Sequence, residues 1–108
     1  MNDTVQHRWI DLAPGYAGYL ALPPARRGPG LLLLQEIFGV NEHIRALADQ
    51  YALDGFVVLA PDLFWRQAPR VELGYEGADW ARARSLMQAY TTEQALADLG
   101  VAAQALRA

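Results

Sequence analysis

The stretch that decides the fold is LLLLQEIFGVNEHI, residues 31–44. It opens with four consecutive leucines, and a continuous apolar run of this kind is typical of a strand covered on both faces. Residues 31–35 are therefore expected to form a strand inside a parallel sheet. A carboxylate, Glu36, follows that strand at once. An acid at the end of the most apolar segment calls for an explanation.

A helix and a second strand are predicted directly after this segment. Asn41 can accept a hydrogen bond from the free amides of a first helical turn, and Gly55 supplies a stop. Between them, apolar residues recur at helical spacing and form one stripe: Ile44, Leu47, Ala48, Tyr51 and Ala52. Residues 56–60, FVVLA, form a second apolar strand that Pro61 ends. This order predicts a βαβ unit with parallel strands and a right-handed crossover.

The flanking segments complete the predicted architecture. Residues 5–12 and 17–22 indicate a hairpin, since Ala-Pro-Gly at 13–15 is a turn signal. Residues 62–77 indicate a long loop, residues 78–90 a helix, and Thr91 with Gln94 a capping box that starts a last helix. The apolar stripe of that helix is expected to contain Leu96, Leu99, Ala103 and Leu106.

The fold class that follows is α/β. Residues 1–108 are interpreted as one domain with an N-terminal hairpin, a parallel βαβ unit and C-terminal helices around an incomplete sheet. A further strand normally follows such a helix in α/β topologies, so we expect the chain to be part of a longer domain.

Composition narrows the classes of function. Of the 108 residues, 53% are hydrophobic and 19% charged, as in globular proteins, and the net charge of −3 argues against a nucleic-acid partner. No cysteine is present, which excludes a disulfide or a thiolate metal site within these residues. No apolar run has the length of a signal peptide or a membrane span, so a cytoplasmic protein without a membrane partner is expected.

Two carboxylates fall where catalytic groups are found in this fold class. Ligands of open α/β sheets bind beyond the carboxyl ends of the parallel strands, and Glu36 and Asp62 follow the two predicted strands. A partly buried carboxylate at that place could exchange protons in catalysis. Alternatively, Glu36 caps backbone amides or pairs with an arginine. Asp62, in Ala-Pro-Asp-Leu, is better explained as a turn residue that binds backbone amides.

Three segments resemble one enzyme family in both order and spacing. QEIFGVN at 35–41, GFVVLAPDL at 55–63 and RQAP at 66–69 are similar to the N-terminal part of dienelactone hydrolases. The resemblance implies an α/β-hydrolase fold and an enzyme that opens enol-lactones, formed when aromatic compounds are broken down, with a Cys-Asp-His triad and no cofactor or metal.

The resemblance also assigns roles to residues of this chain. Glu36 would govern the ionisation of the nucleophile, and the backbone N–H of Ile37 would contribute to the oxyanion hole. Phe38 would line the substrate pocket. Arginines of the family hold the substrate carboxylate, and Arg82 and Arg84 lie near one such position, although the alignment there could also fall on Trp80. Arg82 and Arg84 could equally form a solvated helical face.

The triad itself has no counterpart among these residues. Cysteine is absent, and the only serine, Ser85, lies on a predicted helix without the glycines of a nucleophile turn. His7 is expected on a surface strand and His43 in the first turn of a helix. Neither has a predicted partner for catalysis or for metal binding. Arg66 and Arg70 could reach an anionic ligand from the loop.

Two hypotheses therefore remain. The first is the N-terminal part of a lactone- or ester-opening hydrolase that is inactive as the isolated chain. The second is a non-catalytic binding or oligomerising module with a truncated hydrolase fold. In both, residues 31–34 and 56–60 are expected to expose apolar surface, so that the isolated chain associates with another copy.

Overall fold

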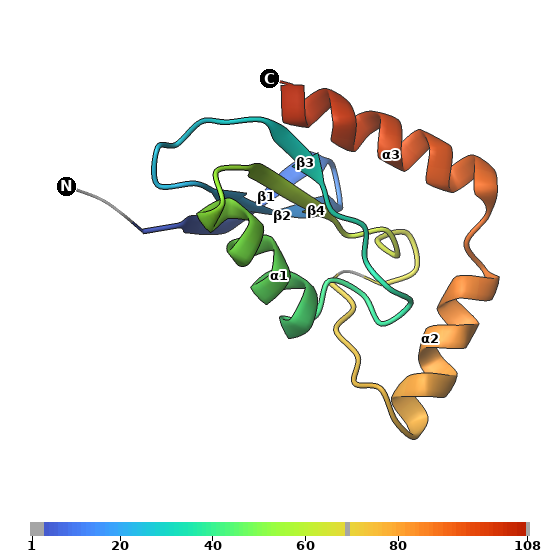
Figure 1. The fold of residues 1–108 in the computed structure, drawn as a ribbon. Helices are drawn as coiled ribbons and strands as arrows, with labels where there is room; N and C mark the ends of the chain where they lie inside the picture. The colour runs from blue at the N-terminus through green and yellow to red at the C-terminus, as the bar shows by residue number, and fades with distance from the viewer. Residues whose placement is uncertain (1–3, 69, 108) are drawn as a thin grey trace.

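The structure, a computed structural model, describes residues 4–68 and 70–107. In this part of the chain, three strands precede the first helix, and one strand separates that helix from two C-terminal helices (Figure 1). They are, in order, β1 (Gln6–Ala13), β2 (Tyr16–Leu22), β3 (Gly30–Leu32), α1 (Glu42–Leu53), β4 (Val57–Pro61), α2 (Ala78–Gln88) and α3 (Thr92–Arg107).

One mixed sheet organises the chain, with the strand order β1-β2-β4-β3. The hairpin β1–β2 is antiparallel, as expected, and β3 pairs with β4 in parallel, which confirms the βαβ unit. The sequence did not predict that β2 pairs antiparallel with β4, where Leu20 lies opposite Leu59. This pairing makes β4 a central strand and joins the hairpin to the parallel strands.

The sheet is covered on both faces, by α1 on one side and by α3 on the other (Figure 1). The main core lies between the sheet and α1, and apart from one tyrosine its members are alanines or β-branched residues that can pack closely: Tyr19, Ala21, Val40, Ile44, Ala48, Ala52, Val58 and Ala60. The buried residues of α1 stand four apart, so they form one stripe along the helix.

Local sequence signals set the ends of these helices. The Asn41 side chain accepts a hydrogen bond from Ile44 N–H at 3.2 Å, and α1 ends before Gly55, whose φ of +105° is left-handed. Thr91 and Gln94 exchange hydrogen bonds of 3.1 and 3.2 Å, which confirms the predicted capping box at the start of α3.

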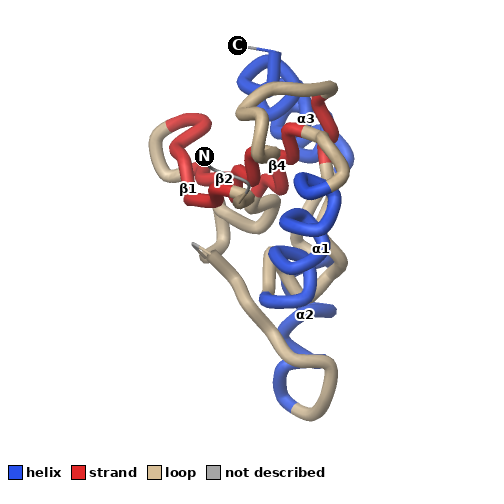
Figure 2. Tube along the Cα trace, turned by 60° about the vertical axis from the view of Figure 1, so that its left-hand side comes forward, coloured by secondary structure: helices blue, strands red, loops and turns tan. Residues whose placement is uncertain are grey.

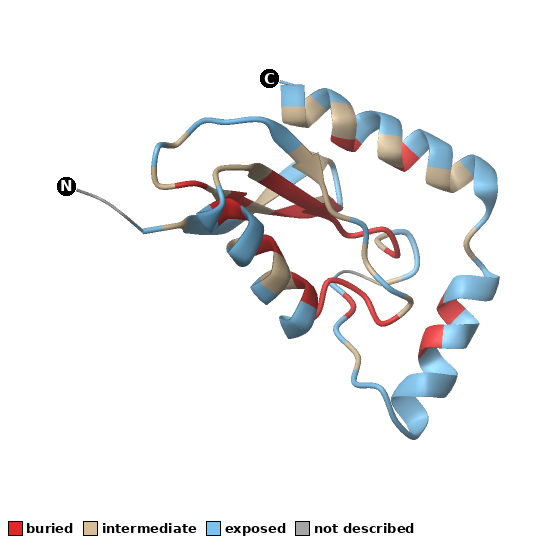
Figure 3. Cartoon of the chain, in the orientation of Figure 1, coloured by how far each residue is buried: buried red, intermediate tan, exposed pale blue. Residues whose placement is uncertain are grey.

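Three packing predictions were wrong. The first parallel strand is shorter than residues 31–35, because only Gly30–Leu32 pair with β4. Residues 58–60 expose no apolar surface, since β4 lies between two strands and two helices (Figure 3).

The third wrong prediction concerns α3. Of the predicted stripe, Leu96 is 69% exposed, whereas Leu99, Ala103 and Leu106 are half-buried. The fully buried residues of the helix are Asp98 and Ala102, which the prediction did not include.

Residues 62–68 and 70–77 are irregular, as predicted, and lead to α2, which lies beyond one end of the sheet (Figure 2). Of the residues of α2, only Ala83 and Leu86 are buried. A smaller core forms there from Phe64, Val71 and Leu86. Among the described residues, no helix combines the length and the apolar character needed to cross a membrane.

Asn41 does more than cap α1, because its side-chain amide also donates to Leu73 O at 3.1 Å and to the Tyr75 hydroxyl at 3.2 Å. We predict that Asn41→Ala lowers the free energy of unfolding by about 2 kcal/mol, since it removes a cap and leaves a buried carbonyl without its partner. Thr91→Ala, which removes only an exposed cap, should cost about 1 kcal/mol. Urea denaturation of both variants checks this, and equal losses would contradict it.

Candidate functional site

The candidate site is built on the turn that follows β3. The Gln35 side chain joins the ends of the two parallel strands: its Oε1 accepts a hydrogen bond from Leu63 N–H at 2.9 Å, and its Nε2 donates to Glu36 O at 3.1 Å. We call this pair of bonds the Gln35 bridge. It fixes the turn relative to the segment after β4, so that Glu36 and Ile37 lie beyond the carboxyl ends of both parallel strands.

A glycine closes the turn. Gly39 N–H donates to Glu36 O at 3.2 Å, and its φ of +87° is left-handed. A Cβ at this position would also collide with the backbone carbonyl of Val71. Leu73 N–H donates to Phe38 O at 2.9 Å, so the loop before α2 packs directly on the turn. At position 39, only glycine can adopt the left-handed φ and lie this close to the Val71 carbonyl without strain.

Glu36 itself is exposed, not partly buried as the sequence suggested. The paired part of β3 ends at Leu32, four residues before Glu36, and the carboxylate stands clear of the sheet. Its Oε1 lies 3.5 Å from the Tyr75 hydroxyl, which also accepts the hydrogen bond from Asn41. Tyr75 therefore connects Glu36 to the cap of α1, a contact that could not be predicted from the sequence.

A cavity of about 190 Å³ lies beside this carboxylate. Three segments distant in sequence line it. They are Leu34, Gln35, Glu36 and Ile37 from the turn, Leu63 and Phe64 after β4, and Met87 and Tyr90, which lie near the end of α2 and just after it. Its wall is mainly apolar. Within residues 4–68 and 70–107, no group accepts a hydrogen bond from Ile37 N–H. The site thus combines a carboxylate, a free amide donor and an apolar wall.

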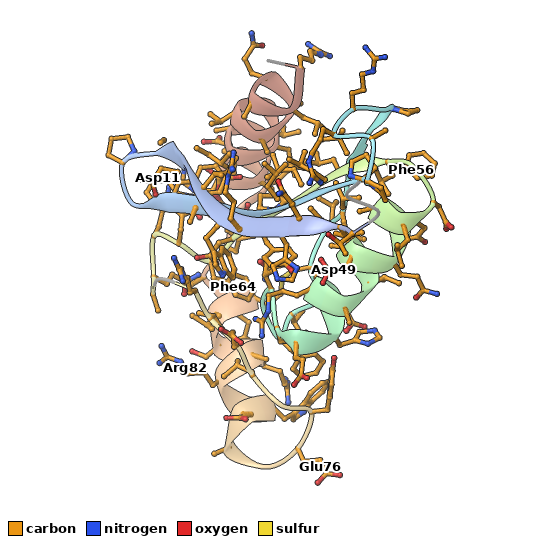
Figure 4. The ribbon with its side chains drawn as sticks, turned by 90° about the vertical axis from the view of Figure 1, so that its left-hand side faces the viewer. Asp11, Asp49, Phe56, Phe64, Glu76 and Arg82 are labelled. Atoms are coloured by element: carbon orange, nitrogen blue, oxygen red, sulfur yellow. The ribbon has the colours of Figure 1, made fainter. Side chains whose placement is uncertain are left out.

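The other candidate substrate residues lie away from this cavity. Phe38 is 8% exposed and packs against Tyr75 and Trp80, with ring centroids 4.4 and 5.5 Å away. Arg82 and Arg84 are exposed on α2, and Arg82 projects on the side of the helix away from α1 (Figure 4). The structure does not bring the two arginines together with Glu36.

Asp62 follows β4 and is a turn residue, as predicted. It is 1% exposed, and its Oδ2 accepts a hydrogen bond from Arg70 N–H at 2.7 Å, while its Oδ1 has no partner among the described residues. Burial raises the pKa of the Asp62 carboxyl above its ordinary value, and the bond and charge of Arg70 offset part of that rise. The carboxyl holds the loop in place.

Arg66 pairs with a buried acid of α3. Its guanidinium donates to Asp98 Oδ2 at 2.8 Å, and the Tyr90 hydroxyl donates to the same oxygen at 3.1 Å. Asp98 is 2% exposed, and Tyr16 donates to its backbone carbonyl. Because Tyr90 lines the candidate cavity, this cluster sets part of the cavity wall. An acid among the apolar residues of α3 was the signal that sequence reasoning missed.

The remaining candidates lie elsewhere. His7 on β1 pairs with Asp49 on α1, with Nδ1 and Oδ2 3.3 Å apart, while His43 is exposed at the second residue of α1. Ser85 is an exposed residue of α2. Among the residues that the structure describes, no group of three potential metal ligands gathers. Arg70 stacks on Trp9, with its guanidinium 4.6 Å from the ring centroid.

Comparison with known proteins identifies relatives. The family model of the dienelactone hydrolase family matches residues 16–108. The carboxymethylenebutenolidase of Pseudomonas sp. strain P51 is 39% identical over 85 residues, which cover 78% of this chain and 36% of that protein. A candidate carboxymethylenebutenolidase from Synechocystis is 42% identical over 84 residues, covering 77% of this chain and 34% of that protein. The chain thus spans about a third of the length of the curated relatives that it matches.

Solved structures agree with the sequence comparison. The crystal structure of a candidate dienelactone hydrolase from Klebsiella pneumoniae superposes with a TM-score of 0.78 at 29% identity. The superposition covers 96% of this chain and 44% of that protein. The incomplete α/β sheet described above therefore corresponds to part of the fold of that structure.

The raised pKa of Asp62 makes a prediction about pH. The folded state holds this proton more tightly than the unfolded chain, so the group contributes most to stability below its unfolded pKa and loses that contribution as pH rises through the folded pKa. Relative to Asp62→Asn, the free energy of unfolding of the native chain should increase as pH falls from 7 toward about 4.

Urea denaturation across this pH range is the measurement, and Asp11→Asn, which removes an exposed carboxylate on β1, is the control. A native chain that loses stability relative to Asp62→Asn on acidification would show that the pKa shift has the opposite sign.

Proposed function

The chain belongs to the dienelactone hydrolase family, and we propose that it forms the N-terminal part of an enzyme that opens enol-lactones or related esters. The observation that carries this proposal is the joint position of the Glu36 carboxylate and the Ile37 amide beside an apolar cavity, beyond the ends of β3 and β4. Ligands of α/β sheets bind at this edge. By resemblance, the substrates come from the breakdown of aromatic compounds.

In the proposed reaction, a nucleophile supplied by the rest of the polypeptide attacks the lactone carbonyl, and the ring C–O bond then breaks. Negative charge develops on the carbonyl oxygen, and the Ile37 N–H would stabilise it. One such donor typically contributes about 10²–10³-fold in rate. The amide is suited to this role because the Gln35 bridge fixes the turn before the reaction.

Glu36 would act on the nucleophile rather than on the substrate. A carboxylate near a thiol disfavours the thiolate, because two negative charges repel each other. Glu36 would therefore keep the nucleophile neutral until substrate binds. Its hydrogen bond to Tyr75 restrains the carboxylate on the side of the α1 cap.

Substrate recognition is the second part of the proposal. Phe38 would support the substrate pocket indirectly, through its packing against Tyr75 and Trp80. Arg82 and Arg84, on the exposed surface of α2, would attract an anionic substrate through their charge. The proposal needs no metal and no cofactor.

A non-catalytic binding or oligomerising module is the alternative. Two half-exposed side chains beside the cavity, Leu34 and Met87, and the unpaired edge of β3 favour association with another copy. This alternative requires neither the Glu36 carboxylate nor the Ile37 amide.

We predict that the isolated chain does not hydrolyse p-nitrophenyl acetate above the background rate, because it contains no cysteine and its one serine lies on an exposed helix. A chimaera in which this chain replaces the matching segment of the Pseudomonas enzyme should open an enol-lactone. Glu36→Gln in the chimaera should lower kcat/KM by at least about tenfold and alter its pH profile, as expected for a group that shifts the pKa of a nucleophile.

Glu76→Gln is the matched control, since Glu76 is an exposed loop residue at the far tip of the molecule (Figure 4). Rapid turnover by the isolated chain, or a Glu36→Gln chimaera as active as the control, would refute the proposed roles. A folded but inactive chimaera that self-associates would support the alternative.

A further inference from the structure

A second cavity, of about 380 Å³, lies at the opposite end of the parallel strands from the candidate site. It is bounded by the sheet, by residues 26–30 and by the last turn of α3, whose end lies over the start of β3 in Figure 1. Val57, at the start of β4, lines it, whereas the candidate site follows the end of β4 at Pro61. Four residue steps along a strand separate these ends by roughly 13 Å.

The floor of this cavity is apolar and belongs to the sheet face opposite α1. Leu20 and Leu22 of β2 point to this face together with Val57 and Leu59 of β4, because Leu20 lies opposite Leu59 in the register. Leu106 of α3 packs on Gly30 and covers one side of the floor. Leu20, Leu22 and Val57 remain only half-buried, so α3 leaves part of the face open.

The rim of the cavity is positively charged. Arg26, Arg27 and Arg107 line it, and no acidic residue does. This local charge is opposite in sign to the net charge of −3. Arg26 is held at the rim by its hydrogen bond to Thr4 O at 3.3 Å and adopts a left-handed φ of +67°, which is uncommon for a residue with a side chain.

From these features we propose that the cavity binds an amphiphilic carboxylate, with its alkyl chain on the leucine floor and its head group among the three guanidinium groups. Arginine binds carboxylates through two parallel hydrogen bonds, which a neutral head group cannot accept in the same way. The volume lies within the usual range for small-molecule sites of about 300–1,000 Å³. The site is separate from the proposed active site.

Further polypeptide and a second copy of the chain are the competing occupants. Among the described residues, the unpaired edges of the sheet are the outer edges of β1 and β3, whereas the open part of the cavity lies over the face of β1, β2 and β4. A segment that pairs with either edge would extend the sheet sideways and leave this part of the floor uncovered. The arginines also favour a small anion over another apolar surface, which would bury their charges without partners.

Decanoate below its micellar concentration is the probe, titrated into the chain by isothermal calorimetry. We expect saturable binding of one decanoate, at least tenfold weaker binding of decanol, which lacks the charge, and no binding of acetate, which lacks the chain. The double variant Arg27→Glu, Arg107→Glu should weaken decanoate binding at least tenfold. Arg84→Glu, on the distant α2, should not.

Amide chemical shifts of the native chain, recorded with and without decanoate, locate the site without any variant. The result therefore does not depend on whether a variant folds. Decanoate should shift the amides of Leu22 and Val57 but not that of Leu63, which lies at the candidate active site. Equal affinity for decanol and decanoate, shifts centred on Leu63, or the absence of binding would overturn the proposal. The same measurements on the chimaera show whether the remainder of a hydrolase occupies the cavity, and loss of decanoate binding there would also overturn it. None of these readouts depends on lactone turnover.

Discussion

The Gln35 bridge holds the candidate site together at the ends of the two parallel strands. One amide side chain accepts from Leu63 N–H and donates to Glu36 O, so the segments that leave β3 and β4 are held at a fixed separation. Without it, the backbone N–H of Leu63 would lose its partner beside an apolar core, at a cost of about 1–3 kcal/mol. Gly39 then folds the turn back against Val71, and Asn41 joins the same turn to α1 and to the loop before α2.

This arrangement gives the turn its proposed chemical capacity. A rigid backbone can hold an amide donor in position before charge develops, which is the condition for stabilising a transition state without reorganisation. The carboxylate of Glu36 lies in water with Tyr75 as its one protein partner among the described residues. The wall of the cavity is held from the other side, where Tyr90 and Arg66 share the buried carboxylate of Asp98. Two hydrogen-bond networks thus hold the walls of the site in position, one around Asn41 and one around Asp98.

Local features of this chain could be predicted from the sequence, whereas contacts between distant segments could not. Apolar periodicity and side-chain caps predicted α1, α3, the hairpin and the parallel pair, because each signal lies within a few residues of its effect. The pairing of β2 with β4 left no such signal, and its omission led to the wrong expectation that residues 58–60 expose apolar surface. Sequence reasoning placed Glu36 at the correct edge of the sheet. Its exposure could not be predicted, because it depends on the residue at which β3 stops pairing with β4. Asp98 was overlooked because its partners, Arg66 and Tyr90, come from other segments.

Amide hydrogen exchange in the Gln35→Leu variant tests the role of the Gln35 bridge most directly. We predict that exchange at Leu63 and at Gly39 becomes about fivefold faster, as expected when one hydrogen bond worth about 1 kcal/mol is lost and the turn loosens. Exchange at Ile44, which Asn41 caps, should stay as it is in the native chain. Leu63 and Gly39 amides that remain as protected as in the native chain would show that Gln35 does not hold the site together.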